Sequence, residues 1–294
     1  MRRSPPVRTT ATDGVLLVDK PSGVTSHDVV AVARRTLGIK RVGHTGTLDP
    51  FATGLLILLV GQATRLAQYV AGEPKVYDAT IVFGAETSTD DLTGDVTRVA
   101  APPAPADVDR AIQSLTGSLR QTPPDYSAKQ VAGRRAYAAA RAGAPLALEP
   151  VPVMVHSWEI RGRTATQLDV TITCGGGTYV RALARDLGRA ASSAAHLTAL
   201  RRVRSGPFDV ADAVTLDDID RGRAAALLPL RLAIPHLPTQ RLAEDELRRV
   251  RHGNAVPGQL RAPLVALLDA EDTLVAIARA DDGMLRPCLV MQDD

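Results

Sequence analysis

The stretch Arg41-Val-Gly-His-Thr-Gly-Thr-Leu-Asp-Pro-Phe-Ala-Thr-Gly-Leu-Leu56 decides how the rest of the chain is organised. Its three glycines permit backbone conformations and close approaches that a side chain would prevent. Pro50 fixes its own φ and biases Asp49 towards an extended conformation. The apolar run 55–60 follows at once and predicts a buried strand. Asp49 therefore lies on a rigid loop beside a buried strand, either as a catalytic carboxylate or as a turn acid that caps a backbone amide.

Length and composition indicate a protein with a substantial core. The chain has 294 residues, 45% of them hydrophobic, so we expect one large domain or a large domain with a small one. No segment reaches the uninterrupted apolar length of about 20 residues that a membrane helix needs. Residues 1–12 are basic, lack the apolar region of a secretory signal, and are expected to form a disordered tail. Cys174 and Cys288 lie far apart, which fits a reducing cytoplasm and indicates neither a disulfide framework nor a zinc site.

The positive charge of the chain is unevenly distributed. Residues 1–234 hold 28 Lys and Arg against 22 Asp and Glu, whereas residues 235–294 hold 7 against 10. Basic residues cluster at 34–41, 134–141 and 201–204. Such clusters are typical of a surface that binds nucleic acid, although solvated surface charge explains many of them.

The pattern of apolar residues predicts an α+β fold with a largely antiparallel sheet. We expect strands at residues 14–20, 55–60, 76–83, 151–160, 167–174 and 196–203. Helices are expected at 26–37, where Ser26 is the predicted N-cap, and at 62–70, 107–115, 134–142 and 178–191. Prolines near residue 235 mark a boundary. Beyond it, residues 235–294 predict a small unit with a helix at 244–252 and short strands at 263–269, 274–280 and 287–291.

Three further residues outside the Asp49 loop are candidates for chemistry. Lys20 precedes a Pro-Ser-Gly turn at the start of a helix and either holds a phosphate or braces the neighbouring loop. Tyr77 is either a base-stacking or proton-transfer group or a half-buried strand aromatic. Arg181 follows a triple-glycine turn and is a candidate partner for a buried carboxylate, whose pKa it would lower. These residues suit covalent or acid–base chemistry on a nucleic acid without a metal, but by themselves they do not identify the reaction.

Four motifs in order resemble the tRNA pseudouridine synthase B family. They are Lys-Pro-Ser-Gly-Val-Thr-Ser at 20–26, Gly-His-Thr-Gly-Thr-Leu-Asp-Pro at 43–50, Lys-Val-Tyr at 75–77 and Gly-Thr-Tyr-Val-Arg at 177–181. The resemblance implies a pseudouridine-synthase fold, in which a central, largely antiparallel mixed sheet is flanked by helices and followed by a small β-rich PUA-like domain. The implied reaction is the conversion of uridine 55 in the T loop of tRNA to pseudouridine, with no cofactor and no metal.

The resemblance also implies roles for individual residues. Asp49 is the catalytic nucleophile, and whether it adds to the base, adds to the sugar or acts through a glycal stays open. Tyr77 stacks on the uracil, and Arg181 pairs with the catalytic aspartate. His44 helps to order the RNA once the target base is flipped out of the loop, which is required because Asp49 cannot reach a stacked nucleotide. The implied substrate contacts beyond His44 come from Tyr179, Leu200, Lys20, Asp91 and Arg202.

The resulting expectation is a cytoplasmic monomer that binds the T arm of tRNA and no membrane. Residues 13–234 are the expected catalytic domain, and residues 235–294 the expected PUA-like domain, which is short and acidic for an RNA-binding module. Two other hypotheses stay open. The first is that the chain is an RNA-folding chaperone whose catalysis is secondary. The second is that it modifies ribosomal RNA through a guide RNA, which the short C-terminal tail and the lack of Lys-rich extensions disfavour.

Overall fold

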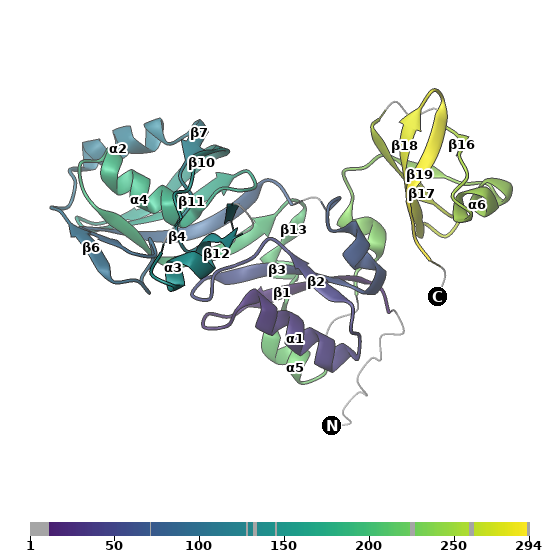
Figure 1. Ribbon diagram of the computed structural model, residues 1–294, viewed down its shortest axis with the longest axis horizontal. Helices are drawn as coiled ribbons and strands as arrows, with labels where there is room; N and C mark the ends of the chain where they lie inside the picture. The colour runs from purple at the N-terminus through teal and green to yellow at the C-terminus, as the bar shows by residue number, and fades with distance from the viewer. Residues whose placement is uncertain are drawn as a thin grey trace. The chain divides into compact units, whose positions relative to one another are not determined.

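The computed structural model describes residues 12–70, 72–127, 129–131, 134–144, 146–223, 227–258 and 262–292 (Figure 1). The predicted tail of residues 1–12 lies outside these ranges except for its last residue. The chain divides into two compact units. Unit 1 comprises Met1–Asp49, Leu55–Ala71 and Asp212–Asp294, and unit 2 comprises Pro50–Gly54 and Gly72–Ala211. Asp49 is therefore the last residue of unit 1 before the chain enters unit 2.

Unit 1 contains a small sheet with helices packed against it. Its strands lie in the order β14 (Val214–Thr215), β1 (Gly14–Lys20) and β3 (Thr53–Val60), and β2 (Val42–Thr45) pairs with β3. The helices are α1 (Ser26–Leu37), α5 (Leu216–Asp220) and the 3₁₀ turns η1 (Gly61–Leu66) and η3 (Leu230–Ala233). Figure 1 shows α1 and α5 side by side, and α1 buries its apolar face on β1 and β3. The buried strand predicted at 55–60 is confirmed, because all six of its side chains are buried.

The first turn of α1 differs from the prediction in one respect. Thr25, rather than Ser26, is the N-cap, because it has the extended backbone that a cap requires (φ −81°, ψ 160°). Its hydroxyl accepts from the amide of Asp28, whose carboxylate in turn accepts from the Thr25 amide at 2.8 Å. Ser26 is the first helical residue, so its hydroxyl is available for a distant partner. At the other end Gly38, at φ +69°, closes the helix as predicted.

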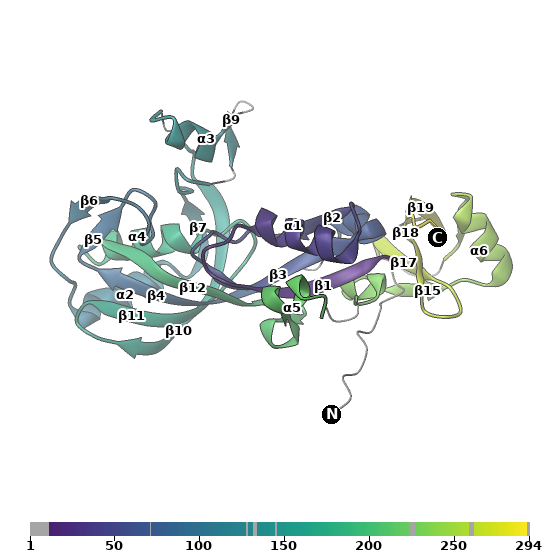
Figure 2. The same cartoon turned by 90° about the horizontal axis from the view of Figure 1, so that it is seen from below.

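Unit 2 is built on an antiparallel sheet. The strands lie in the order β12 (Ala195–Ser205), β4 (Lys75–Phe83), β11 (Gln167–Cys174), β10 (Val151–Arg163) and β7 (Gly117–Gln121). Helix α4 (Val180–Ala190) packs on β12 and on α2 (Pro105–Ser114). Smaller elements are β5 (Ala85–Thr87), β6 (Val96–Val99), β8 (Gln130–Val131), β9 (Arg134–Arg135), α3 (Ala136–Arg141), β13 (Phe208–Asp209) and η2 (Val210–Asp212). Figure 2 shows β9 and α3 standing away from the sheet.

Strand β3 begins in unit 2, where its first residues pair in parallel with β12. Gly54 lies opposite Arg202, with φ at +98°, and a Cβ on Gly54 would lie 2.3 Å from the Arg202 carbonyl oxygen. Only glycine is therefore compatible with this close approach. On its other side Arg202 lies opposite Tyr77 of β4. The chain that carries Asp49 thus continues into a strand whose register is fixed against β12.

The C-terminal residues of unit 1 form a curled five-stranded sheet with its own apolar core. The strand order is β15 (Thr239–Arg241), β17 (Leu264–Leu268), β18 (Leu274–Asp281), β19 (Met284–Val290) and β16 (Val256–Pro257), and helix α6 (Glu244–Arg251) packs beside them. The predicted helix and three strands are confirmed, whereas β15 and β16 were missed because each is only two or three residues long. The fold class is mixed α+β, as predicted.

Two predicted helices are shorter than expected. The segment 62–70 forms only the 3₁₀ turn η1, which ends at Leu66. Hydrogen bonding of the 3₁₀ type is typical of such short pieces of helix. In the segment 134–142 the first two residues pair with β8, so the helix begins at Ala136. No helix within the described ranges is long and apolar enough to cross a membrane.

Candidate active site

The Asp49 loop of unit 1 is fixed by one buried hydroxyl. Ser26 Oγ accepts from the amide of Leu48 at 3.0 Å and donates to the Leu48 carbonyl at 3.1 Å. Both main-chain groups of the residue before Asp49 are therefore satisfied by a side chain of α1. Asp49 itself is half-buried, and Pro50 beyond it is exposed. This arrangement holds a carboxylate at the surface on a rigid backbone.

Lys20 lies beside this loop as a fully buried cation. Its Nζ donates to the carbonyl oxygens of Pro21 at 2.9 Å and Val24 at 2.8 Å, which holds the turn between β1 and α1. Burial lowers the pKa of Lys20 to about 8, while the negative charges of Asp49 and Asp28 raise it. The Lys20 ammonium therefore interacts with the carboxylate of Asp49. Because burial lowers its pKa, Lys20 loses its positive charge at a lower pH than an exposed lysine does.

His44 lies on β2 in the same unit. It is half-buried, and its ring meets the ring of His27 edge to face, with centroids 5.6 Å apart. Residue 44 lies opposite Leu58 of β3 in the ladder. Lys20, His44 and Asp49 are thus all carried by the first 49 residues of unit 1.

The remaining predicted site residues belong to unit 2. Tyr77 points to the buried side of β4 with Ala79, and Leu200 of β12 lies opposite Ala79. Tyr77 and Leu200 are each 7% exposed, and Arg202, which lies opposite Tyr77, is 1% exposed. The register therefore groups these three side chains at one end of the β4–β12 ladder.

Arg181 and Asp91 form a buried ion pair in unit 2. Arg181 Nη1 lies 3.6 Å from Asp91 Oδ2, and both side chains are about nineteen-twentieths buried. Asp91 Oδ1 also accepts from Thr89 Oγ1 at 2.7 Å and from the amide of Thr93 at 2.9 Å. Asp91 therefore joins the loop 87–95 to Arg181 in the first turn of α4.

Tyr179 is the N-cap residue of α4, where it has an extended backbone. Its main chain is held by the side-chain amide of Gln121: the Tyr179 amide donates to Gln121 Oε1 at 2.8 Å, and Gln121 Nε2 donates to the Tyr179 carbonyl at 3.1 Å. The Tyr179 side chain is half-buried. The start of α4 is thus anchored by the end of β7.

Sequence reasoning missed a second ion pair next to the first. Arg185 Nη1 lies 2.8 Å from Asp90 Oδ2, and both side chains are about nine-tenths buried. The only sequence signal was the spacing of Arg181 and Arg185, because residues four apart lie on the same face of a helix. Nothing in the sequence indicates that adjacent aspartates face these two arginines.

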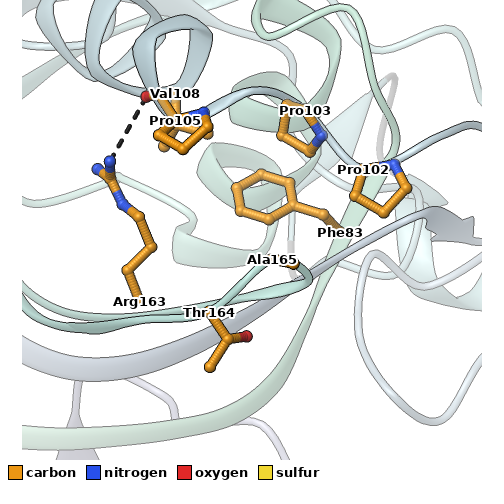
Figure 3. A pocket seen from close by; sticks show the side chains of 8 residues that line it. All are labelled: Phe83, Pro102, Pro103, Pro105, Val108, Arg163, Thr164 and Ala165. Atoms are coloured by element: carbon orange, nitrogen blue, oxygen red, sulfur yellow. Dashed lines mark hydrogen bonds between the residues drawn. The ribbon is translucent and has the colours of Figure 1, made fainter.

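Two of the pockets in unit 2 are lined by residues other than the predicted site residues. One, of about 240 Å³, is lined by Phe83, Arg163 and the proline-rich approach to α2 (Figure 3). Figure 3 shows Phe83 facing these prolines, with Arg163 Nη1 donating to the Pro105 carbonyl at 3.5 Å. The other, of about 310 Å³, is open and lies between Glu73, Met154 and Gly176. Within the described ranges, no group of three or more His, Cys, Asp or Glu side chains is arranged to hold a metal ion.

Comparisons with known proteins place the chain among enzymes that modify RNA. A family model for the N-terminal domain of TruB family pseudouridylate synthases matches residues 34–180, and a model for the C-terminal domain of tRNA pseudouridylate synthase B matches residues 181–227. A tRNA pseudouridine synthase B of Thermobifida fusca is 43% identical over 289 residues, covering 95% of this chain and 98% of the relative. One of Geobacillus thermodenitrificans is 37% identical over 301 residues, covering 95% and 100%.

Solved structures share the fold. A structure of an H/ACA RNP bound to a substrate RNA containing 2'-deoxyuridine matches with a TM-score of 0.73 and 23% identity, over 98% of this chain and 88% of the other. A Cbf5-Nop10-Gar1 complex matches with a TM-score of 0.70 and 25% identity, over 96% and 84%. This likeness concerns the architecture of the chain.

Proposed function

The chain belongs to the TruB family of pseudouridylate synthases, and we propose that it converts uridine 55 in the T loop of tRNA to pseudouridine. The observation that carries this proposal is the identity of about two residues in five with proteins named tRNA pseudouridine synthase B, over nearly their whole length. The reaction breaks the bond between N1 of uracil and C1' of ribose and forms a bond between C5 and C1'. The proton of C5 is lost and N1 gains one, so the reaction is an isomerisation without an added reagent.

We propose Asp49 as the nucleophile of this reaction. Its support is a half-buried carboxylate on a backbone that Ser26 fixes, in a motif shared with the family. A held carboxylate suits covalent catalysis, because a positioned nucleophile replaces one difficult step by two easier ones.

The other site residues are proposed in supporting roles. Tyr77 is the ring that stacks on the target uracil, Leu200 and Tyr179 line its pocket, and Arg181 is the catalytic arginine. His44 contacts the RNA once the target base is flipped. Lys20, Asp91 and Arg202 are buried, so we propose that they serve substrate binding through the loops and strands that they hold. Residues 13–234 are the proposed catalytic domain, and residues 235–294 the proposed PUA-like domain.

Mapping pseudouridine in tRNA tests the proposal directly. Unmodified tRNA is incubated with the wild-type protein, with Asp49→Asn and with Asp220→Asn, a control at an exposed aspartate of unit 1. We expect pseudouridine at position 55 with the wild-type and control proteins, and a loss of rate on the order of a thousandfold or more with Asp49→Asn at unchanged tRNA affinity. Activity near the wild-type level in Asp49→Asn contradicts the role of Asp49, and modification elsewhere than position 55 contradicts the substrate.

The same variant separates catalysis from RNA folding. An Asp49→Asn protein that binds tRNA but forms no pseudouridine is introduced into cells that lack the gene. If the growth phenotype depends on pseudouridine, the variant does not restore it. Full restoration by the inactive variant instead assigns the cellular role to RNA folding.

A further inference from the structure

Two arginines of α4, one turn apart, bind the same pair of loops. Arg181 donates from Nη1 to the carbonyl of Thr89 at 2.8 Å and from Nη2 to the carbonyl of Tyr126 at 2.9 Å. The first carbonyl belongs to the loop 87–95 and the second to the segment 121–127. The orientation of the Arg181 guanidinium is therefore set by the positions of both segments.

Arg185 bridges the same two segments one turn later. Its Nη1 donates to Asp90 Oδ2 at 2.8 Å, and its Nη2 donates to the carbonyl of Thr122 at 2.9 Å. Asp90 immediately follows Thr89, so any movement of Asp90 moves a carbonyl that holds Arg181. Within the described part of the chain, the hydrogen bonds of Arg185 go to Asp90, Thr122 and Asp186. Arg185 is linked to Arg181 through the two segments that both arginines bind.

Asp90 is held in an unusual position. Its backbone lies in the left-handed region at φ +59°, and its carbonyl accepts from the amide of Leu197 on β12 at 3.1 Å. Such a conformation is costly for a residue other than glycine, and it persists where tertiary contacts fix it. The aspartate is therefore locked on both its main-chain and its side-chain groups.

Burial opposes the charged form of Asp90 in this pair. Burial raises the pKa of Asp90 to about 6, although Arg185 and Arg181 both lower it. Asp186 raises it further and Arg189 lowers it. The loop 87–95 also carries the buried carboxylate of Asp91 and the exposed carboxylate of Asp95. The contact that β12 makes with Asp90 within the described ranges is the hydrogen bond from the main chain of Leu197. A carboxylate whose charged form is disfavoured by the fold contributes more stability when neutral, so the contacts of this pair with the two segments are better explained by positioning than by stability.

We propose that Asp90 and Arg185 are positioning residues, whose ion pair holds the loop 87–95 and the segment 121–127 in the places that orient Arg181 for catalysis. This inference rests on the proposed role of Arg181 in pseudouridine formation. When Asp90 takes up a proton, its pairing with Arg185 weakens and both segments are released from their common clamp. Displacement of a catalytic group by about 1 Å is enough to reduce a rate by one or two orders of magnitude. The rate of the chemical step therefore falls as Asp90 is neutralised.

Single-turnover pseudouridine formation across pH 5 to 8.5 tests this inference. We expect the wild-type rate to fall on the acid side with a midpoint near pH 6, the pKa of Asp90. Asp90→Asn, which resembles the protonated residue, is expected to lose on the order of tenfold in kcat at pH 7.5 with little change in KM, and to show no such acid limb. Arg185→Gln removes a charge that lowers the Asp90 pKa, so its acid limb is expected at higher pH.

Matched measurements separate this effect from unfolding. Asp95→Asn changes an exposed aspartate of the same loop and is expected to keep the wild-type pH profile. Thermal unfolding of each variant shows whether it is folded, and Arg185→Lys, which keeps the charge but loses the paired donors, should recover part of the rate. A folded Asp90→Asn protein that retains the wild-type acid limb overturns the inference while leaving the proposed function intact. A wild-type protein that forms no pseudouridine overturns both.

Discussion

A buried charge accompanies a proposed catalytic residue in each unit, and the two differ in sign. In unit 1 the ammonium of Lys20 faces Asp49, and in unit 2 the carboxylate of Asp90 faces Arg185 one helical turn from Arg181. Burial shifts both pKa values towards neutrality, to about 8 for Lys20 and about 6 for Asp90. In both places desolvation is the largest influence, and it outweighs an attractive neighbour.

The difference lies in what each charge is bonded to. Lys20 donates to two carbonyls of its own turn, so it holds a local structure next to Asp49. Asp90 receives a donor from a helix 95 residues away in the sequence, so it joins distant segments. The comparison shows that a buried charge can serve as a local brace or as a long-range clamp, at a similar cost in stability. Each buried charge should make the free energy of unfolding depend on pH, because a shifted pKa means that the folded and unfolded states bind protons differently.

Replacement of Lys20 should give the largest change in the pH dependence of stability. Below about pH 8 the folded protein carries a buried ammonium that the unfolded chain keeps in water, and this penalty is relieved as pH rises from about 8 to 10.5. The unfolded state binds more protons in that window, so the stability of the wild-type protein should increase there by up to about 3 kcal/mol. Lys20→Met should lack the increase, and it should also be less stable at pH 7 because the carbonyls of Pro21 and Val24 lose their donor.

Urea denaturation at pH 7, 8, 9 and 10 measures this effect. Lys40→Met, at an exposed lysine of the same unit, serves as the control and should follow the wild-type curve. If Lys20→Met shows the same rise between pH 8 and 10 as the wild-type protein, Lys20 does not titrate in that window and the similarity to Asp90 is lost.

Replacement of Asp90 should have a somewhat smaller effect on the pH dependence of stability. For Asp90 the wild-type protein gains stability as the pH falls, whereas for Lys20 it gains stability as the pH rises. Its folded-state pKa of about 6 lies above the ordinary value of 3.8, so the charged carboxylate is disfavoured by the fold above pH 6. As pH falls from about 6 to 3.8 the folded state binds more protons than the unfolded state, and stability should increase by up to about 3 kcal/mol, slightly less than the change expected for Lys20. Asp90→Asn should therefore be at least as stable as the wild-type protein at pH 8, with the difference disappearing near pH 4.

Denaturation curves at pH 4, 5, 6 and 8 show whether this expectation holds. Asp95→Asn again provides the comparison within the same loop. A marked loss of stability in Asp90→Asn at pH 8 would mean that the ion pair stabilises the fold, contrary to the balance inferred from its burial. Together with the activity profile, this measurement decides whether the pair acts through stability or through position.

The sequence was sufficient for the elements with strong periodicity. The alternation of Tyr77, Ala79, Ile81 and Phe83 predicted the buried side of β4, and the apolar run 55–60 predicted β3. Short strands such as β2 and β16 were missed, because two to four residues carry too little pattern. The cap of α1 was displaced by one residue, since Thr25 and Ser26 have equal preference for capping and only the backbone conformation chooses between them.

The site divides in the same way. Motifs led to the proposal of Asp49, Tyr77 and Arg181, because their neighbours in the sequence carry the pattern. Asp90 and Arg185 look like ordinary surface charges, and only the tertiary fold brings them together across 95 residues. The requirement for glycine at position 54 also depends on a distant strand, since the conflicting atom belongs to Arg202. Residues whose role depends on contacts far apart in the chain are those that sequence reasoning could not find.

An exposed ion pair gives the smallest expected effect and completes the comparison. Arg35 and Asp220 form a salt bridge between α1 and α5, and more than half of each side chain is exposed. Water screens such a pair, so Asp220→Asn should change the free energy of unfolding by less than about 0.5 kcal/mol, and less again at high salt. Urea denaturation in 0.05 and 1 M NaCl measures this, with pseudouridine formation unchanged. A change as large as those at Lys20 or Asp90 would show that burial is not what distinguishes the two internal charges, because the same pairing would then have the same effect in solvent.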